Sequence, residues 1–197
     1  MDSVIQLLVS QLGSGAVGKI SEQLGVDESQ AQQAVGMALP LILDALTRNA
    51  SSADGAQALT NALRRDHDGS ILNNLPHAIT RPEVRQDGAA ILGHVLGGNR
   101  SAVQNSVSRA TGMDPNQVAQ IFAILAPIVL GGLGQMQRKN NLDAQGVSTL
   151  LQEERTTVEK TASGLAQLLD MDGDGDVSEE IVTLGANLLG GLFGGNK

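Results

Sequence analysis

Two stretches of the chain decide the fold: ISEQLGVDESQAQQAVGMALPLILDAL at residues 20–46 and VSRATGMDPNQVAQIFAILAPIVLGGL at residues 107–133. They align without a gap, 87 residues apart, and share eight identical positions. Unrelated sequences of this length share roughly one or two. The identical pairs are Ser21/Ser108, Gly25/Gly112, Asp27/Asp114, Gln30/Gln117, Gln33/Gln120, Pro40/Pro127, Leu43/Leu130 and Leu46/Leu133. The alignment indicates an internal duplication.

Each stretch has the residues expected of a helix, a tight turn and a second helix. Gly25 and Gly112 suit the left-handed conformation that ends a helix. Asp27 and Asp114 suit the N-cap of the next helix, and a Gln follows each of them by three residues, as a capping box requires. Pro115 occupies a first-turn position, where the missing N–H costs no hydrogen bond. The sequence therefore predicts a helical corner in each unit.

The second helix of each unit has one apolar face at helical spacing. Its residues are Ala31, Ala34, Val35 and Ala38 in the first unit, and Val118, Ile121, Phe122 and Leu125 in the second. Pro40 and Pro127 stand at equivalent points, and we expect each to kink or break its helix. A further helix is expected after each unit, over 49–63 and 139–151.

The composition favours an all-α fold. Of 197 residues 41% are hydrophobic but only 1% are aromatic, so Leu, Ile, Val, Ala and Met fill the core. We expect two related helical units packed together, followed by a C-terminal helix, an acidic loop and a further helix. The predicted boundaries are 1–65 for the first unit, 66–87 for a linker-like segment, 88–160 for the second unit and 161–197 for the C-terminal part.

Charge and composition also restrict the partners. A net charge of −8 disfavours nucleic acid and anionic lipid, which attract basic surfaces. Cysteine is absent, so disulfides, thiolate nucleophiles and Cys-type zinc sites are excluded. The apolar run 121–133 is too short to span a membrane and predicts a buried helix. No cleavable signal peptide is visible in MDSVIQLLVSQLG, so a cytoplasmic location is the default expectation.

A resemblance rests on four segments: DHDGSILNNL at 66–75, DGAAILGHVLGGN at 87–99, LAPIVLGGLG at 125–134 and LLDMDGDGDVSEEI at 168–181. Together they resemble the bacterial family of proteins known as domain of unknown function 937. The resemblance covers nearly the whole chain and implies a bacterial source. The family has no established activity, so it implies no catalytic residue.

The strongest chemical signal is the acidic loop DMDGDGDVSEEI at residues 170–181. Carboxylates stand at the alternate positions 170, 172 and 174, and Gly175 follows where the chain must turn sharply. Calcium takes six to eight oxygen ligands, and this spacing wraps them around one centre. The sequence predicts one Ca²⁺ bound by the side chains of Asp170, Asp172, Asp174 and Glu179, with the backbone carbonyl of Asp176.

The loop departs from an EF-hand at its twelfth position, where Ile181 replaces the bidentate Glu. Glu179, at the tenth position, is the expected substitute, as in shortened calcium loops. The alternative is a solvated acidic turn without metal, since Asp and Gly are common in turns. Carboxylates this close repel one another unless a cation lies between them, which favours the calcium interpretation. Apolar helical patterns flank the loop, so bound metal would set the angle between the last two helices.

Two motifs imitate other functions. The segment 13–19, GSGAVGK, matches a dinucleotide fingerprint and most of a P-loop, but Ile20 stands where a P-loop needs Ser or Thr. The segment LPLILD at 39–44 imitates the strand that ends in a magnesium-binding Asp of such proteins. Both segments are predicted to be helical instead. The helical corners also have the pattern of a helix-turn-helix. Their second helices offer Asn, Gln and Glu but no basic residue, so we expect no specific DNA binding.

The three histidines do not form a metal or catalytic motif. His94 falls on a mostly apolar helix, where we expect a structural, satisfied side chain, and His67 is expected in a turn. A second metal site at Asp66 and Asp68 is the weaker alternative for that turn.

These patterns favour a non-enzymatic, calcium-binding helical interaction or scaffold protein. Glycines on the helices are expected to permit close helix packing or self-association with a protein partner; they are Gly93, Gly97, Gly98, Gly131 and Gly132. The alternative is a DNA-associated regulator that uses the helix-turn-helix-like corners. An enzyme is not expected.

Overall fold

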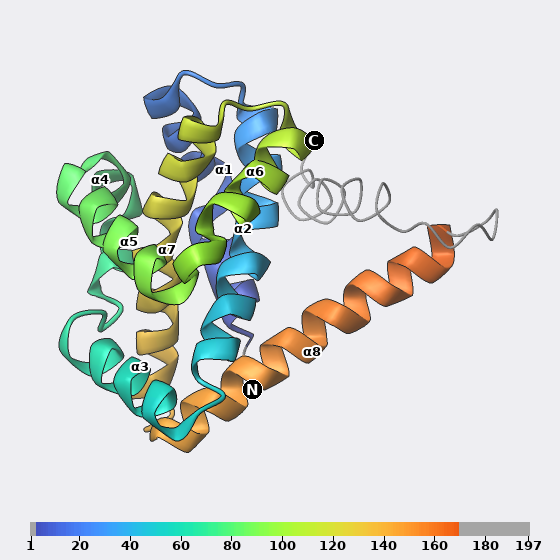
Figure 1. The fold of residues 1–197 in the computed structure, drawn as a ribbon. Helices are drawn as coiled ribbons and strands as arrows, with labels where there is room; N and C mark the ends of the chain where they lie inside the picture. The colour runs from blue at the N-terminus through green and yellow to red at the C-terminus, as the bar shows by residue number, and fades with distance from the viewer. Residues whose placement is uncertain (1–2, 170–197) are drawn as a thin grey trace.

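The computed structural model describes residues 3–169, apart from the side chains of Ser14 and of residues 158–169. Within this part of the chain all regular structure is helical (Figure 1), which confirms the predicted class. The elements are α1 (Val4–Leu24), α2 (Glu28–Asn49), α3 (Ala53–Arg65), η1 (Ser70–Asn74), α4 (Leu75–Thr80), α5 (Pro82–Val95), η2 (Gly97–Asn99), α6 (Arg100–Thr111), α7 (Pro115–Lys139) and α8 (Ala144–Leu169).

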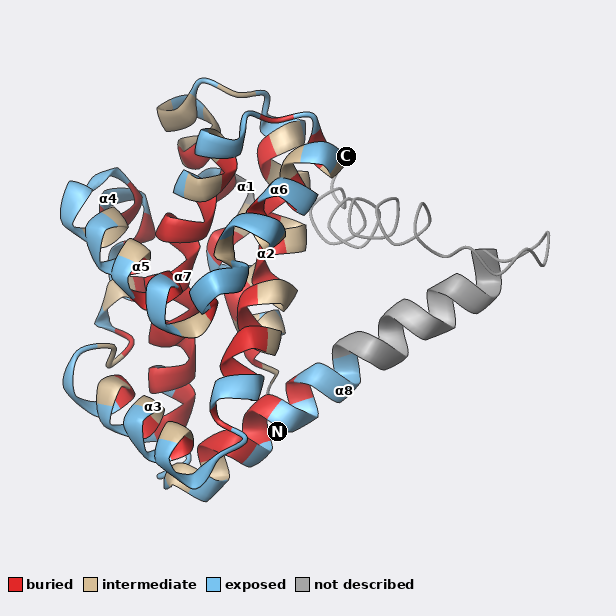
Figure 2. Ribbon diagram, viewed as in Figure 1, coloured by how far each residue is buried: buried red, intermediate tan, exposed pale blue. Residues whose placement is uncertain are grey.

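The central helix is α7, which α1, α2, α3, α5 and α6 all contact (Figure 2). Every residue from 121 to 134 is buried, which confirms the predicted buried helix. The length of α7 and a mean hydropathy of 1.8 meet the requirement for a membrane span, but 83% of that apolar window is covered by other helices. A core helix meets the same requirement, so the hydropathy is weak evidence for a membrane.

The two predicted corners have the same backbone geometry. Gly25 ends α1 with φ 64°, and Gly112 ends α6 with φ 68°, so both take the left-handed conformation expected of them. The Ser21 hydroxyl donates to the carbonyl of Val26 at 2.7 Å, and the Ser108 hydroxyl donates to the carbonyl of Met113 at the same distance. Each identical Ser and Gly therefore has the same structural role in both halves.

The corners are also joined to each other. The Gln30 amide, on α2, donates to the carbonyl of Thr111 at the end of α6 at 3.3 Å. The Gln117 amide, on α7, donates to the carbonyl of Leu24 at the end of α1, also at 3.3 Å. The 87-residue shift relates Leu24 to Thr111 as it relates Gln30 to Gln117, so the two bonds are reciprocal. They satisfy helix-end carbonyls that have no partner in their own helix.

Only the second corner has a capping box. The Asp114 carboxylate accepts from the backbone N–H of Asn116 at 2.8 Å, and the Gln117 side chain accepts from the N–H of Asp114 at 3.1 Å. Asp27 makes no side-chain cap bond, so the predicted first capping box is wrong. Gln30 is turned instead toward the other corner, where it bonds to the α6 carbonyl.

Neither proline breaks its helix, so of the two expected outcomes, a kink or a break, the break is wrong. Both α2 and α7 continue through Pro40 and Pro127. Pro127 has no N–H to offer the carbonyl four residues earlier, at Ala123. That oxygen faces α5, where a Cβ at Gly88 would overlap it. Contact with the Gly88 backbone thus covers the acceptor that Pro127 leaves unpaired. The break in α1 is at Gly13, whose φ of 25° and ψ of 177° are not helical.

The linker-like segment 66–87 is packed against the core. It forms η1, α4 and the beginning of α5, and its side chains at Leu72, Leu75 and Ile79 are buried. The turn that opens it lies on the glycines of α7: a Cβ at Gly134 would overlap the His67 carbonyl oxygen. The family-like segments 66–75, 87–99 and 125–134 therefore meet around α7.

Candidate functional site

All five predicted calcium ligands lie outside the described residues: Asp170, Asp172, Asp174, Asp176 and Glu179. The helix that leads to them, α8, ends at Leu169, immediately before the first ligand. The described residues that lead to this site are those of α8, whose contacts with the other helices follow.

A buried carboxylate holds α8 on the beginning of α1. Glu154 is only 4% exposed, and it accepts hydrogen bonds from the backbone N–H of Val4 at 2.7 Å, the N–H of Ile5 at 3.2 Å and the Ser3 hydroxyl at 2.8 Å. The first N–H groups of a helix lack internal partners and carry partial positive charge. A negative side chain at this place satisfies these groups and is stabilised by them.

The first half of α8 has further anchors on the other helices. Val147, Leu150 and Leu151 are buried against the core. The Ser148 hydroxyl donates to the carbonyl of Ala50 at 3.0 Å. Sequence reasoning did not foresee Glu154 or Ser148 as anchors, because their partners lie about a hundred residues or more away along the chain.

The second half of α8 leaves the helical body and projects from it (Figure 1). At 1.5 Å per residue, the helix from Glu154 to Leu169 extends about 22 Å.

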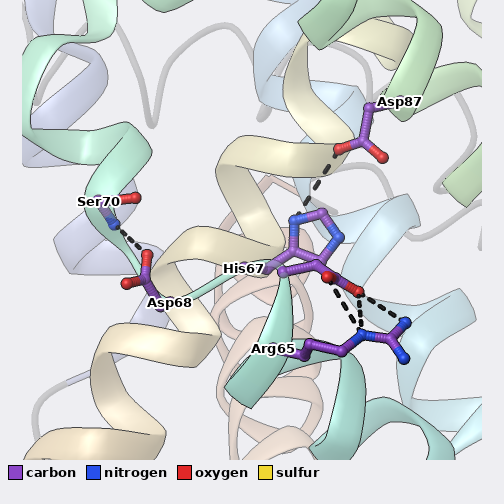
Figure 3. A network of polar contacts seen from close by, with 6 residues as sticks. Arg65, His67, Asp68, Ser70 and Asp87 are labelled. Carbon is purple, nitrogen blue, oxygen red and sulfur yellow. Dashed lines mark hydrogen bonds and ion pairs between the residues drawn. The ribbon is translucent and has the colours of Figure 1, made fainter.

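The turn between α3 and η1 contains the two carboxylates proposed as a second metal site (Figure 3). Asp68 accepts from the backbone N–H of Ser70 at 2.9 Å and from Arg138 at 3.0 Å. Hydrogen bonds from Ser70 first, and then the bond from Arg138, lower the pKa of the Asp68 carboxyl to about 2. Asp66 pairs with Arg65 at 2.9 Å, and this hydrogen bond lowers the pKa of Asp66 below its usual range.

Both carboxylates are thus paired with arginine. Over residues 3–157, where side chains are described, no three acidic or histidine side chains lie close enough to hold a metal. The turn is a structural element in which Asp68 ties η1 to α7.

His67 and His94 lie in different environments. His67 lies in a turn, as predicted; its side chain is 12% exposed and its Nδ1 lies 3.9 Å from a carboxylate oxygen of Asp87 (Figure 3). His94 lies on a helix, as expected, and is exposed on the last turn of α5. The apolar residues around it, Ile91 and Leu92, face the core while His94 faces away.

The P-loop imitation is helical, as predicted, except at Gly13. Residues 13–19 lie in α1, where Lys19 pairs with Glu22 at 2.7 Å. Residues 39–44 lie in α2 rather than in a strand. A P-loop needs a strand followed by a loop that leads into a helix, so this geometry does not form a phosphate cradle.

The helix-turn-helix-like corners place their second helices inside the bundle. A reading helix must offer a whole exposed side to the major groove, whereas most of α7 is covered by its neighbours. Exposed polar residues remain in the first turns, among them Asn116 and Gln120. The acidic Asp27, Glu28 and Asp114 stand at the same ends.

Two surface grooves bring together residues that the sequence did not group. One, of about 570 Å³, is lined by Thr47, Arg48, Ser51, Gln152, Arg155 and Thr156, and Asp44 lies between its arginines at 3.0 and 3.6 Å. The other, of about 390 Å³, lies between α5, the beginning of α6 and α7. It is lined by Arg85, Gln86, Ala89, Arg100, Asn116, Ala119, Gln120 and Ala123.

The described chain is thus an all-helical protein with two joined helical corners around a glycine-containing core helix and a projecting final helix. The chain belongs to the family described as bacterial protein of unknown function (DUF937), which matches residues 6–137 and, in a second match, 135–197. This confirms the family resemblance read from the four segments. Neither a curated protein nor a solved structure matches the chain.

Proposed function

We propose that this protein is a non-enzymatic, calcium-binding helical scaffold that binds a protein partner or itself. The observation that carries the proposal is the spacing of Asp170, Asp172 and Asp174, followed by Gly175 and Glu179. Three alternating carboxylates, a Glu and the Asp176 carbonyl provide the oxygen ligands that calcium prefers.

The distribution of charge supports a cation at this loop. Residues 3–157 carry 11 Lys and Arg against 13 Asp and Glu, so the body is nearly neutral. Residues 170–197 carry one Lys against six Asp and Glu, all six within 170–180. The acidity of the chain is therefore concentrated in the loop, where a divalent ion reduces the repulsion.

The anchoring of α8 supports a scaffold. Glu154 and the buried Leu150 and Leu151 hold the first half of the helix, so the loop follows a helix with a defined direction. Calcium binding would extend this order through the loop and set the direction of the segment after it.

We infer that an internal duplication produced the two corners. The eight identities, the paired Gly25 and Gly112 turns and the reciprocal bonds of Gln30 and Gln117 support it. A chain that pairs with its own copy in this way resembles a dimer fused into one polypeptide, which is a common symmetric arrangement.

The alternative is a DNA-associated regulator, favoured by one observation: Arg85 and Arg100 lie beside Asn116 and Gln120 in the smaller groove. Arginine and amide side chains are the groups that contact phosphates and bases. The covered sides of α2 and α7 and the acidic corner ends weigh against it. A mobility-shift assay with duplex DNA at about 0.15 M salt tests it, and sequence-selective retention would favour the regulator.

The calcium proposal is tested by thermal melting with calcium and with chelator. For the wild type, calcium at ~100 times its dissociation constant should stabilise the part of the chain that unfolds together with the loop by about 2.7 kcal/mol. A dissociation constant between ~10⁻⁶ and ~10⁻³ M is expected for a loop without the twelfth-position Glu. Magnesium should stabilise less, because it requires a tighter octahedron and retains its waters.

Two variants make this test specific. Asp172→Ala removes a proposed ligand and should abolish most of the calcium response. Glu180→Ala removes the same charge from the same loop but no proposed ligand, so it should keep the response. A wild-type melting temperature that does not change with calcium, or equal responses of the two variants, would show that the loop is an acidic turn.

A further inference from the structure

The smaller groove contains two arginines without acidic partners. Within residues 3–157, no carboxylate lies within 4.0 Å of the Arg85 or Arg100 side chain, whereas Arg48, Arg65 and Arg138 each pair with an Asp. Both arginines are half-buried. A guanidinium that is partly removed from water and lacks a counter-charge favours binding of an anionic group.

Neutral contacts hold these arginines at the groove. Arg100 donates to the carbonyl of Ala89 at 3.4 Å, which draws the beginning of α6 toward α5. In the amide orientation that satisfies both ends of the Gln23 side chain, its oxygen accepts from Arg85 and its nitrogen donates to the carbonyl of Ile79. These partners position the two guanidinium groups without cancelling their charge.

The remaining lining suits a peptide backbone. Ala89, Ala119 and Ala123 supply small side chains, so a chain can approach the helices closely. Gln86, Asn116 and Gln120 supply amides, which both donate and accept hydrogen bonds. The lining includes no aromatic side chain on which a nucleic acid base would stack. The chemistry therefore fits an acidic peptide with small residues.

One segment of this chain has that composition. Residues 170–180, DMDGDGDVSEE, combine six carboxylates with two glycines. The groove lies between α5, α6 and the N-terminal half of α7, whereas α8 packs on α2, α3 and the C-terminal end of α7. From Gln120 to Lys139, α7 alone extends about 28 Å. α8 also projects away from the other helices (Figure 1).

We propose that, in the absence of calcium, residues 170–180 of one chain dock in the groove of a second copy, with their carboxylates on Arg85 and Arg100. The contact joins two different surfaces, so it is heterologous and links chains head to tail. Calcium and the groove compete for the same carboxylates. This competition rests on the proposed function, while the docking itself does not.

The decisive experiment is an intermolecular spin-label measurement on the full chain. The protein contains no cysteine, so Thr183→Cys introduces a single labelling site next to the acidic loop. The spin-labelled chain, at natural isotope abundance, is mixed with ¹⁵N-labelled chain that has no spin label. A total concentration of about 0.5 mM suits a dissociation constant near 1 mM. In chelator, the side-chain amide resonances of Gln86, Asn116 and Gln120 should broaden.

Charge variants identify the docking groups. Arg85→Gln with Arg100→Gln in the ¹⁵N chain should remove the broadening. Arg64→Gln with Arg109→Gln removes the same charge, from two arginines that do not line the groove, and should preserve it. Raising salt from about 0.05 M to about 0.5 M should weaken the association about tenfold or more, because it screens exposed charges. Calcium should reverse the broadening in the wild type.

The outcomes separate this inference from the calcium proposal. Absence of intermolecular broadening in chelator overturns the docking even if calcium stabilises the chain. A chain that carries both the spin label and ¹⁵N reports contacts within one molecule. If the amides broaden only in that sample, docking between copies is overturned, and the chain's own loop occupies the groove. Perturbation of the same amides by duplex DNA at about 0.15 M salt, without broadening by the label, overturns it in favour of nucleic acid. If calcium does not bind, the chelator measurement still tests the docking.

Discussion

The two halves of the chain use the same corner but stabilise it differently. Both end their first helix with a left-handed glycine, and both send a Gln across to the other corner. Only the second half adds a capping box at Asp114 and a carbonyl covered by Gly88. The second half also forms the buried centre of the fold, because α7 is covered on most sides while α2 is partly exposed. A repeated local pattern is therefore stabilised differently when its two copies occupy different positions in the core.

The largest expected effect concerns the contact of α5 with α7, which the first half lacks. Gly88→Ala places a Cβ on the Ala123 carbonyl oxygen, a backbone atom that cannot move alone. We expect a loss of about 3 kcal/mol or more in the free energy of unfolding. Gly93→Ala, on the same helix with open space around it, should be neutral or stabilise by up to about 1 kcal/mol. Urea unfolding followed by circular dichroism at 222 nm measures both, and equal effects would contradict the close packing.

The next effect concerns α3 and α8, the helices that follow the first and the second half. Of these two, α8 has a buried carboxylate, Glu154. Glu154→Gln keeps the size of the side chain but removes its charge from the N-terminus of α1. Hydrogen bonds to a charged group contribute about 1.5–3 kcal/mol, so a loss within that range is expected. Glu153→Gln, on the exposed side of the same turn, should change stability by less than about 0.5 kcal/mol. If both variants unfold at the same urea concentration, Glu154 does not cap α1.

The equivalent glutamines should differ because one of them has two roles. Gln117 accepts from the Asp114 N–H and donates to the Leu24 carbonyl, whereas Gln30 donates to the Thr111 carbonyl. At about 1 kcal/mol per hydrogen bond, Gln117→Ala should cost about 2 kcal/mol and Gln30→Ala about 1 kcal/mol. A double variant whose loss differs from the sum would measure the coupling between the corners.

The two N-cap positions should also differ, but by a smaller free energy of unfolding. Asp114→Ala removes a cap that is present and should cost about 1 kcal/mol. Asp27→Ala removes a side chain that makes no cap hydrogen bond, so it should cost only about 0.3 kcal/mol through the charge at the helix end. Equal losses would show that Asp27 caps α2 in solution.

The smallest effect is a pH dependence in the turn that joins the halves. The pKa of Asp68 is lowered from 3.8 to about 2, so its folded form binds a proton less readily than its unfolded form. A lowered pKa stabilises the fold above pH 3.8, and the contribution disappears as the pH falls from about 4 to about 2. Wild type should therefore be more stable than Asp68→Asn at pH 7, and the difference should shrink over this interval. If wild type and Asp68→Asn still differ equally in stability at pH 2, the effect of the substitution does not come from the charge of the Asp68 carboxylate.

The candidate site was predicted from sequence to different degrees. The proposed calcium ligands Asp170 to Glu179 lie close together in the sequence, so their spacing alone supports the prediction of a calcium site. Calcium binding remains a prediction. The groove could not be found in this way, because Arg85, Arg100 and Asn116 are 15 and 16 residues apart and belong to three helices. The overall charge of −8 also concealed that the body is nearly neutral and that this groove is basic.

The sequence by itself determined the helices and their corners, because the signals are local. A glycine that takes a positive φ and an aspartate before a first turn act within a few residues, so Gly25, Gly112 and Asp114 could be assigned without a partner. The carbonyl to which Gln30 donates and the helix end that Glu154 caps were set by tertiary contacts alone. Those outcomes depend on groups brought together from distant parts of the chain, and burial then makes each unpaired carbonyl or carboxylate costly enough to select one partner.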